Sequence, residues 1–428
     1  MSAIIRWGIA LLVAFGGPAC GMGTESVGAG GAPTNGGESN GGAAMGGALA
    51  TGGASGGATA GADSCRPRDD ADSLRVPVRL PIKLPKPGIE ATGLNGMHRG
   101  FNLGNALDAP SEGAWGVVIQ ERHFDMAVEA GLDHVRVPVR FSAHAASEPP
   151  YTIDETFLQR VDWVLDQAES RGLSAVLDVH HYEELVADPE GQAERFIALW
   201  QQLAARYYAR PPSLKYELAN EPNGKLDDYW NYLYPKALKA VRAVDPVRTV
   251  IIDGAFWASP QSLDDLFLPD DPNLVATFHL YDPFPFTHQG ASWQGPELRT
   301  RCVVFPGPPF EPLVPVEAAQ KVNWIAEWFA GYNSAPPETN PGGAAVIEEA
   351  FAFVDRFIEN SGRAVYLGEF GAVDTADPAS RERWVRLVRE HAEARGIPWA
   401  YWNDGGAMRA FDVKTGEWVP YLRRALLE

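Results

Sequence analysis

Short apolar runs alternate with amphipathic stretches along the chain from about residue 89 onward. Eight of the apolar runs are typical of buried strands, and they lie at 99–103, 134–138, 174–179, 214–219, 249–252, 274–278, 364–368 and 398–401. Five stretches between them space their apolar residues as helices do, at 123–130, 155–171, 191–209, 229–244 and 381–395. Gly131 and Gly172 follow two of these stretches, at the position where helices commonly end in a left-handed residue.

This alternation predicts a protein of the α/β class. Strand and helix alternating about eight times over roughly 330 residues favour a (β/α)8 TIM barrel. A doubly wound open sheet gives a similar pattern, but the phosphate-binding motif G-x-G-x-x-G is absent from the sequence. Polar residues follow nearly every predicted strand. Because the chemistry of such barrels lies at the C-terminal ends of the strands, these residues are the candidates for a functional site.

The first 20 residues have the features of a secretory signal peptide. Arg6 precedes an apolar run at 7–15 that is too short to cross a bilayer, and small residues follow it. The segment that ends in Gly-Pro-Ala-Cys20 resembles a bacterial lipoprotein signal, although Gly17 stands where an aliphatic residue is usual. We therefore expect a lipid anchor at Cys20, and ordinary signal cleavage nearby is the alternative.

Two further segments precede the predicted barrel. Residues 21–64 are almost all small or polar and cannot bury a core, so they predict a flexible linker before a folded domain at 65–428. The Pro-rich passage at 76–87 predicts an extended segment. If Cys20 carries lipid, Cys65 and Cys302 remain as an even pair. They either form a disulfide, which we favour slightly, or stay as two free thiols.

Composition narrows the function classes. The formal net charge of −19 argues against a nucleic-acid partner, which would require a basic face. Hydrophobic residues make up 45% of the chain, which is enough for a sizeable core without a membrane-spanning domain. The chain also contains 13 Trp, and tryptophan in excess of the needs of a core indicates aromatic platforms for flat ligands.

Seven of the eight predicted strands have polar residues within them or directly after them. The motifs that contain them are Gly100-Phe-Asn-Leu-Gly-Asn105, Val135-Arg-Val-Pro-Val139, Val176-Leu-Asp-Val-His-His-Tyr182, Tyr216-Glu-Leu-Ala-Asn-Glu-Pro222, Thr277-Phe-His-Leu-Tyr-Asp282, Tyr366-Leu-Gly-Glu-Phe-Gly371 and Ala400-Tyr-Trp-Asn403. In this order the motifs resemble glycoside hydrolase family 5, a family of retaining barrel glycosidases. The resemblance spans residues 98–403, and Asn-Glu-Pro after the fourth strand is its most specific part.

The resemblance implies that Glu221 is the general acid/base and Glu369 the nucleophile. Retaining hydrolysis needs two carboxyl groups that face each other across the scissile bond, about 5 Å apart. The fourth and seventh strands lie on opposite sides of a barrel mouth, so these two side chains can face each other. A solvated or helix-capping glutamate is the alternative for either residue alone, and the pair favours catalysis.

Neighbouring residues fit supporting roles. Family resemblance implies that Asn220 holds the 2-hydroxyl of the sugar. Arg136 lies in an apolar strand, where an unpaired charge is costly, and we predict Glu369 as its partner, with a structural ion pair elsewhere as the alternative. His279 and Tyr281 are two residues apart and share a face of their strand. The resemblance implies that Tyr281 bonds the nucleophile and that His279 shapes the surroundings of the acid/base.

Substrate contacts are predicted from the same strand ends. His180 matches the family histidine of the third strand, and His181 is a candidate sugar contact, although the two roles could be reversed. Trp402 matches the sugar-stacking platform of the family. Further contacts are expected from four residues in strand-end loops, namely Asn105, Trp115, Trp257 and Trp293.

Two other features bear on the site. His180, His181 and His279 with a glutamate would suit zinc, but Asn-Glu-Pro has no role in such a site, so we expect neither a metal nor another cofactor. About 35 residues from 282 onward lack clear periodicity, and long irregular loops are often functional. We predict that this loop forms one wall of the cleft and that Cys65 fixes it.

The resemblance implies an endoglucanase that hydrolyses β-1,4-glucosidic bonds of cellulose or a related β-glucan by double displacement. Mannan, xyloglucan or another β-glycan is the alternative substrate within the family. A catalytically silent polysaccharide-binding surface protein is the alternative of another class. We expect a monomer whose partner is a polysaccharide and which is secreted or held at a bacterial surface.

Overall fold

The computed structural model describes residues 65, 94–403 and 405–428. The predicted signal peptide with Cys20, the predicted linker at 21–64 and the Pro-rich passage at 76–87 lie outside the described residues. A disulfide joins Cys65 to Cys302, 237 residues further along the chain, which is the pairing favoured from the sequence.

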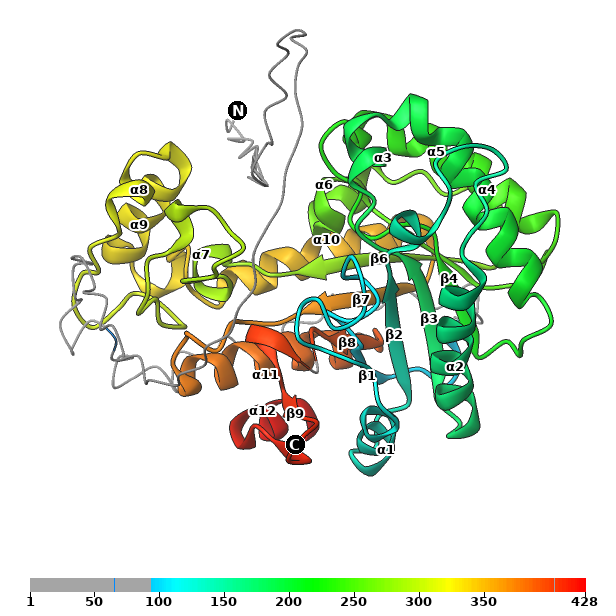
Figure 1. The fold of residues 1–428 in the computed structure, drawn as a ribbon. Coiled ribbons are helices and arrows are strands. Elements are labelled where there is room, and N and C mark those ends of the chain that lie inside the picture. Colours follow the sequence, from blue (N-terminus) through cyan, green and yellow to red (C-terminus); the bar gives the residue numbers. More distant parts are fainter. Residues whose placement is uncertain (1–64, 66–93, 404) are drawn as a thin grey trace, which may run out of the picture. The chain divides into compact units, whose positions relative to one another are not determined.

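Eight parallel strands close into a barrel in chain order, and β8 pairs with β1 (Figure 1). The strands are β1 (Arg99–Asn102), β2 (His134–Val139), β3 (Ser174–Val179), β4 (Leu214–Glu217), β5 (Val250–Asp253), β6 (Leu274–Leu280), β7 (Val365–Phe370) and β8 (Trp399–Tyr401). The predicted (β/α)8 TIM barrel is confirmed, and no predicted strand boundary differs from the observed one by more than two residues. A hairpin of β9 (Phe411–Asp412) and β10 (Glu417–Trp418) follows the barrel.

Helices connect the strands. The α-helices are α1 (Glu121–Glu129), α2 (Glu155–Ser170), α3 (Glu183–Ala187), α4 (Pro189–Tyr207), α5 (Leu226–Arg242), α6 (Ala255–Ala258), α7 (Phe284–Thr287), α8 (Glu317–Gln320), α9 (Asn323–Ser334), α10 (Ala345–Ser361), α11 (Pro378–Ala394) and α12 (Pro420–Leu427). The 3-10 helices are η2 (Phe141–His144), η3 (Pro260–Asp265), η4 (Pro296–Leu298), η5 (Pro337–Thr339) and η6 (Gly406–Met408). In the part of the chain that the structure describes, none of the helices combines the length and apolar character needed to cross a bilayer.

All five predicted helices are present, as α1, α2, α4, α5 and α11. Helices α4 and α11 begin earlier than predicted because Asp188 and Asp377 cap them, each followed by a proline in the first turn. The prediction missed α10. Its buried residues Ile347, Phe351 and Val354 have helical spacing, and Gly362 ends the helix in a left-handed conformation, so the sequence did contain a signal for it.

The interior of the barrel has an apolar layer beneath a polar one. The apolar layer comprises Leu94, Met97, Val176, Ile251, Val275, Tyr366 and Ala400. Residues two apart on a strand point to the same side of the sheet. Asp178 therefore lies above Val176 on β3, and Asp253 lies above Ile251 on β5. This geometry places polar side chains inside the barrel at the carboxyl ends of the strands.

The chain between β6 and β7 carries α7, α8, α9 and α10, and the first three of these lie together at the left of Figure 1. Residues 282–316, where no periodicity was found, contain only α7 and η4 as regular structure. Gln289 is fully buried and anchors this loop, because its side chain donates to the Val303 carbonyl and accepts from the Val303 amide. The disulfide at Cys302 adjoins this anchor.

Lys215 on β4 is a buried lysine, and its replacement tests how much its burial costs the stability of the barrel. It is 2% exposed and makes only long hydrogen bonds of 3.3 Å to the Ser174 hydroxyl and the Ser213 carbonyl, and burial lowers its pKa from 10.5 to about 8. We predict that Lys215→Met stabilises the protein by about 1–4 kcal/mol at pH 7, because an apolar side chain of similar volume avoids the desolvation cost.

The sign of the pH dependence follows from the lowered pKa of Lys215. Between pH 8 and 10.5 the unfolded chain binds more protons at this residue, so the stability of the wild type rises with pH there. The difference between variant and wild type should therefore shrink across this window. Urea unfolding of both proteins at several pH values measures this difference, and a difference independent of pH would contradict the prediction.

Candidate active site

Glu221 and Glu369 face each other at the carboxyl end of the barrel. Glu221 lies four residues beyond the end of β4, and Glu369 is in β7. One carboxylate oxygen of each residue and a ring nitrogen of His279 all lie within 4.8 Å of one another. This separation fits the roughly 5–5.5 Å between the carboxyl groups of retaining glycosidases better than the roughly 6.5–9.5 Å of inverting ones.

Arg136 of β2 is fully buried and contacts Glu369, as the sequence predicted. Its Nη1 donates to Oε1 of Glu369 at 2.6 Å and to Oδ1 of Asn102 at 3.0 Å. The short charge-assisted bond fixes the carboxylate of Glu369 on one side. Asn102 was not predicted, and its amide also donates to the Gly368 carbonyl at 3.0 Å, which ties β1 to β7.

Most of the hydrogen bonds and ion pairs of Arg136 were not predicted from the sequence. Its Nε and Nη2 donate to the two carboxylate oxygens of Glu217, at 2.9 and 2.5 Å, in a bidentate pair. Nη2 also lies 3.1 Å from Oδ2 of Asp178 and donates to Oδ1 of Asn220 at 2.8 Å. Glu217 and Asp178 are charged residues within apolar strands, so the argument that selected Arg136 could have found them too.

Two donors hold the carboxylate of Glu369. Besides Arg136, the Tyr281 hydroxyl donates to Oε2 at 2.7 Å, which is the contact that the family resemblance implied. Burial raises the pKa of Glu369 to about 7, against the opposing effects of His279, Arg136 and Tyr281. Both hydrogen bonds favour the charged form of Glu369.

The surroundings of Glu221 favour its protonated form. Burial, with the negative charges of Glu217 and Asp178, raises its pKa to about 7. Its Oε1 lies 2.8 Å from Nδ1 of His279, and its side chain is 24% exposed. Interacting carboxyls lose their protons in two steps that belong to the pair. Because two donors favour the charged form of Glu369, they favour Glu221 as the site of a proton that the pair shares.

Several predicted site residues have left-handed backbone conformations. Glu221 has a φ of 47°, and Asn105, His181 and Trp257 have φ values of 63°, 48° and 56°. Such conformations are strained for most residues other than glycine and asparagine, at a cost of about 1–3 kcal/mol each, and they cluster at functional sites. Tyr151, Phe256, Ala258 and Cys302 share this conformation and are not predicted site residues. The strain at Glu221, His181 and Trp257 coincides with strand ends that the sequence had identified.

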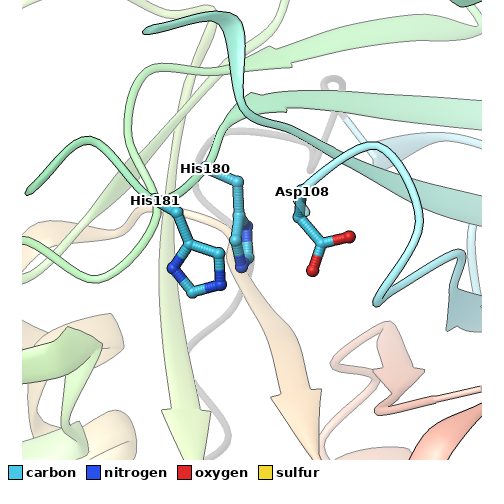
Figure 2. A group of neighbouring side chains, drawn as sticks. All are labelled: Asp108, His180 and His181. Atoms are coloured by element: carbon cyan, nitrogen blue, oxygen red, sulfur yellow. The ribbon is translucent and has the colours of Figure 1, made fainter. Parts of the chain in front are cut away.

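His180 and His181 follow β3 and lie beside Asp108, as Figure 2 shows. Nδ1 of His180 bonds Asp178 at 3.0 Å, and its ring stacks on Trp402 with the centroids 5.6 Å apart. The Trp115 ring meets the His181 ring edge-on at 5.5 Å. Ring contacts through His180 and His181 thus connect Trp115 with Trp402. Three of these residues, Trp115, His181 and Trp402, are predicted substrate contacts.

Asp108 was not predicted from the sequence. Its carboxylate accepts the backbone amides of Asn105 and Ala106, at 3.0 and 2.7 Å, and so shapes the loop that presents Asn105. Burial raises the pKa of Asp108 to about 7. Aspartates commonly cap nearby backbone amides in this way, so the sequence carried no specific signal for this residue.

The two other predicted tryptophans lie beyond β5 and β6. The backbone amide of Trp257 donates to the Pro222 carbonyl at 3.1 Å, directly after Glu221. Trp293 is 47% exposed and lies 6.3 Å, between ring centroids, from His288. His288 in turn packs edge-on against Tyr281 at 5.1 Å, so the irregular loop does reach the site. His288 itself was not predicted.

Three groups of side chains have potential metal-ligand atoms within 4.8 Å of one another. They are Asp108 with His180 and His181, Glu217 with Asp253 and His279, and Glu221 with His279 and Glu369. The zinc alternative required His180, His181 and His279 in one site. Within the described residues, His279 instead groups with carboxylates of β4, β5 and β7, and this grouping does not support that alternative.

A parallel barrel with two facing carboxyls at its strand ends defines a class of protein, the barrel glycoside hydrolases. Comparisons with known proteins agree with this class. The profile of the family described as Cellulase (glycosyl hydrolase family 5) matches residues 92–407. Endoglucanase H of Acetivibrio thermocellus is 33% identical over 310 residues, which are 72% of this chain and 30% of that protein.

Other relatives match along most of their length. Endoglucanase C of Acetivibrio thermocellus is 30% identical over 318 residues, which cover 71% of this chain and 90% of that protein. The structure of endoglucanase Cel5A from the hyperthermophilic Thermotoga maritima has a TM-score of 0.67 and 38% identity, and covers 78% of this chain and 99% of that one. The chain belongs to glycosyl hydrolase family 5. It spans about a third of the length of Endoglucanase H and of the Cellulase/esterase CelE of the same organism.

The bond between Tyr281 and Glu369 can be tested by Tyr281→Phe, which keeps the ring against His288. Without the hydroxyl the ionised form of Glu369 loses a donor, so the acidic limb of the kcat/KM profile should move to higher pH. We expect kcat to fall roughly 10- to 100-fold. The pH profile and the unfolding temperature of both proteins are measured together, and an unmoved acidic limb would contradict this prediction.

Proposed function

We propose that the protein is a retaining endo-β-1,4-glucanase that cleaves cellulose or a related β-glucan by double displacement. The observation that carries the proposal is the unequal environment of two facing carboxyls. Glu369 accepts from a cation and a phenol, whereas Glu221 is partly exposed beside a histidine. Membership of the family and relatives named endoglucanases support the type of bond.

In the first step a carboxylate oxygen of Glu369 attacks the anomeric carbon while the glycosidic bond breaks. Glu221 donates its proton to the leaving oxygen, and a glycosyl ester forms on Glu369. In the second step the Glu221 carboxylate takes a proton from water, whose oxygen attacks the same carbon. The ester bond breaks, Glu369 leaves as a carboxylate and Glu221 is again protonated. Two inversions retain the β configuration.

Asn220 and Arg136 assist the first step. Oδ1 of Asn220 accepts from Arg136 at 2.8 Å, so the amide Nδ2 is the group that remains for the 2-hydroxyl of the sugar. A hydrogen bond to this hydroxyl strengthens as positive charge develops on the ring. Arg136 keeps Glu369 ionised and, through Asn220, also orients the amide next to the acid.

The predicted tryptophans supply sugar platforms in this proposal. Trp115 and Trp293 are 44% and 47% exposed, and Trp257 and Trp402 are half-buried. Apolar faces of glucose rings pack well on indoles. Platforms in the loops after β1, β5, β6 and β8 would bind several consecutive sugars, which suits cleavage inside a chain.

β-Mannan is a second candidate substrate. Structures of Cel5A from Thermotoga maritima, 38% identical to this chain, are described in complex with mannotriose and with cellobiose. Glucans and mannans differ in the orientation of one hydroxyl, which loop contacts distinguish rather than the carboxyl pair. The silent binding protein is disfavoured, because both carboxyls and their partners are present in the arrangement that catalysis needs.

The proposal is tested by hydrolysis of soluble β-glucans, xyloglucan and β-mannan with wild type, Glu221→Gln and Glu369→Gln. Each variant should lose activity on polysaccharide by about 1,000-fold or more. Glu184→Gln, an exposed residue of α3, serves as the matched control and should retain full activity. Proton NMR of the first product should show the β-anomer. A fully active Glu369→Gln, or an initial α-anomer, would exclude double displacement.

The proposal extends to the bacterial cell surface, where Cys20 carries a lipid and residues 21–64 act as a tether. The support is the sequence of residues 1–20 and its resemblance to a lipoprotein signal. Expression in a bacterial host should give a membrane-bound enzyme, and Cys20→Ala should release it or block its maturation. Cell fractionation with detection of an incorporated fatty acid measures both, and wild type recovered without lipid would refute the anchor.

A further inference from the structure

Asp253 is a buried carboxyl to which the mechanism above gives no role. It ends β5, and its side chain is fully buried. Its Oδ1 accepts the backbone amide of Glu221 at 3.1 Å, and its carbonyl accepts Nε1 of Trp230 at 2.8 Å. Asp253 is therefore held in place directly behind the proposed acid/base.

Two buried polar atoms at this position have no hydrogen-bond partner among the described residues. They are Oδ2 of Asp253 and Nε2 of His279. Nε2 of His279 lies 4.0 Å from Oδ1 of Asp253, and Nδ1 of the same ring lies 2.8 Å from Oε1 of Glu221. A buried polar group without a partner is costly, so this pair calls for a physical explanation.

The charges around Asp253 determine its protonation. Glu217 of β4, Asp178 of β3 and Glu369 of β7 surround a single cation, Arg136 of β2, and Tyr281 adds no charge. Three carboxyl groups already share this one cation, so a fourth negative charge would add repulsion without any counter-charge. Burial and the charge of Glu217 raise the pKa of Asp253 well above its usual value, so the group is a neutral carboxylic acid that can donate a hydrogen bond.

The tautomer of His279 decides whether Glu221 faces a ring N–H group or a ring lone pair. Burial lowers the pKa of His279 to about 4, so the ring is neutral and only one of its nitrogens carries a proton. With the proton on Nδ1, the ring donates to Oε1 of Glu221 whether Glu221 is protonated or ionised. With the proton on Nε2, a lone pair would face Oε1 at 2.8 Å and would draw the proton of Glu221 away from the substrate.

We propose that Asp253 is a positioning residue that donates its carboxyl proton toward Nε2 of His279 and thereby fixes the Nδ1–H tautomer. The proposal rests on the role of Glu221 as acid/base. The oxygen 4.0 Å from Nε2 is Oδ1, which accepts the Glu221 amide, so the donating oxygen is Oδ2, and the carboxyl group has to turn it toward the ring. Hydrogen bonds of catalytic groups often tighten in this way only with substrate. Oε1 of Glu221 is then always an acceptor, and Oε2 carries the proton that is transferred.

The closing experiment compares Asp253→Asn with Asp253→Ala. The amide of Asn is neutral, can donate to Nε2 and can accept the amide of Glu221, so kcat should stay within about threefold and the pH profile should be unchanged. Ala removes the donor, and the ionised form of Glu221 then loses its fixed N–H partner. The alkaline limb of kcat/KM should move to higher pH, with kcat reduced roughly 10- to 100-fold. Asp228→Asn, an exposed residue of α5, is the matched control.

A second measurement does not depend on activity or on the alanine variant. Nitrogen NMR of wild type with 15N-labelled histidine, with His279→Gln used to assign the signals, reports which ring nitrogen carries the proton. A proton on Nδ1 supports the proposal. A proton on Nε2, an Asp253→Asn variant with a shifted alkaline limb, or an Asp253→Ala variant with an unshifted one overturns it. If Glu221→Gln remains active, the proposed function fails, but the tautomer result still decides the contact between Asp253 and His279.

Discussion

The active site depends on one buried cation. Arg136 contacts the carboxyl groups of Glu217, Asp178 and Glu369 at once and donates to the side-chain oxygens of Asn102 and Asn220. Its contacts span β1, β2, β3, β4 and β7, so the residue that holds the barrel interior together also sets the position of the proposed nucleophile. A group that leaves buried charges unpaired when removed is much harder to replace than one at the surface.

This arrangement explains how two similar carboxyls acquire different properties a few ångströms apart. Glu369 lies inside the network, where a guanidinium and a hydroxyl favour its charge. Glu221 lies at the edge of the network, where buried carboxylates of β3 and β4 oppose its ionisation. Pairs whose environments separate their protonation states can divide the roles of acid and nucleophile between them. The polar layer of the barrel thus also gives Glu221 and Glu369 different tendencies to ionise.

The sequence predicted the barrel and the carboxyl pair because both depend on order along the chain. Strand periodicity placed Arg136 within the second strand and His279 and Glu369 at the ends of the sixth and seventh. The cost of burying an unpaired charge paired Arg136 with Glu369, and the family resemblance implied the carboxyl pair. It did not reveal that Glu217 is the bidentate partner of Arg136, because contacts across a barrel depend on strand stagger, which no local pattern encodes. Asp253 was passed over because the predicted fifth strand ended one residue earlier and no motif marked its end. Helix α10 was not predicted, because it follows the long irregular segment after β6.

The contrast between buried strand residues and exposed loop residues explains why the site indicates the type of bond more clearly than it indicates the polysaccharide. The groups that would act on the bond are held by buried strands and by each other, and changing one affects the rest. The groups that would choose the sugar chain, such as Trp115 and Trp293, lie in loops and are nearly half exposed. Loops tolerate substitution because few neighbours depend on them. A family built this way can change its polysaccharide through its loops while the charge network, and with it the chemistry, stays the same.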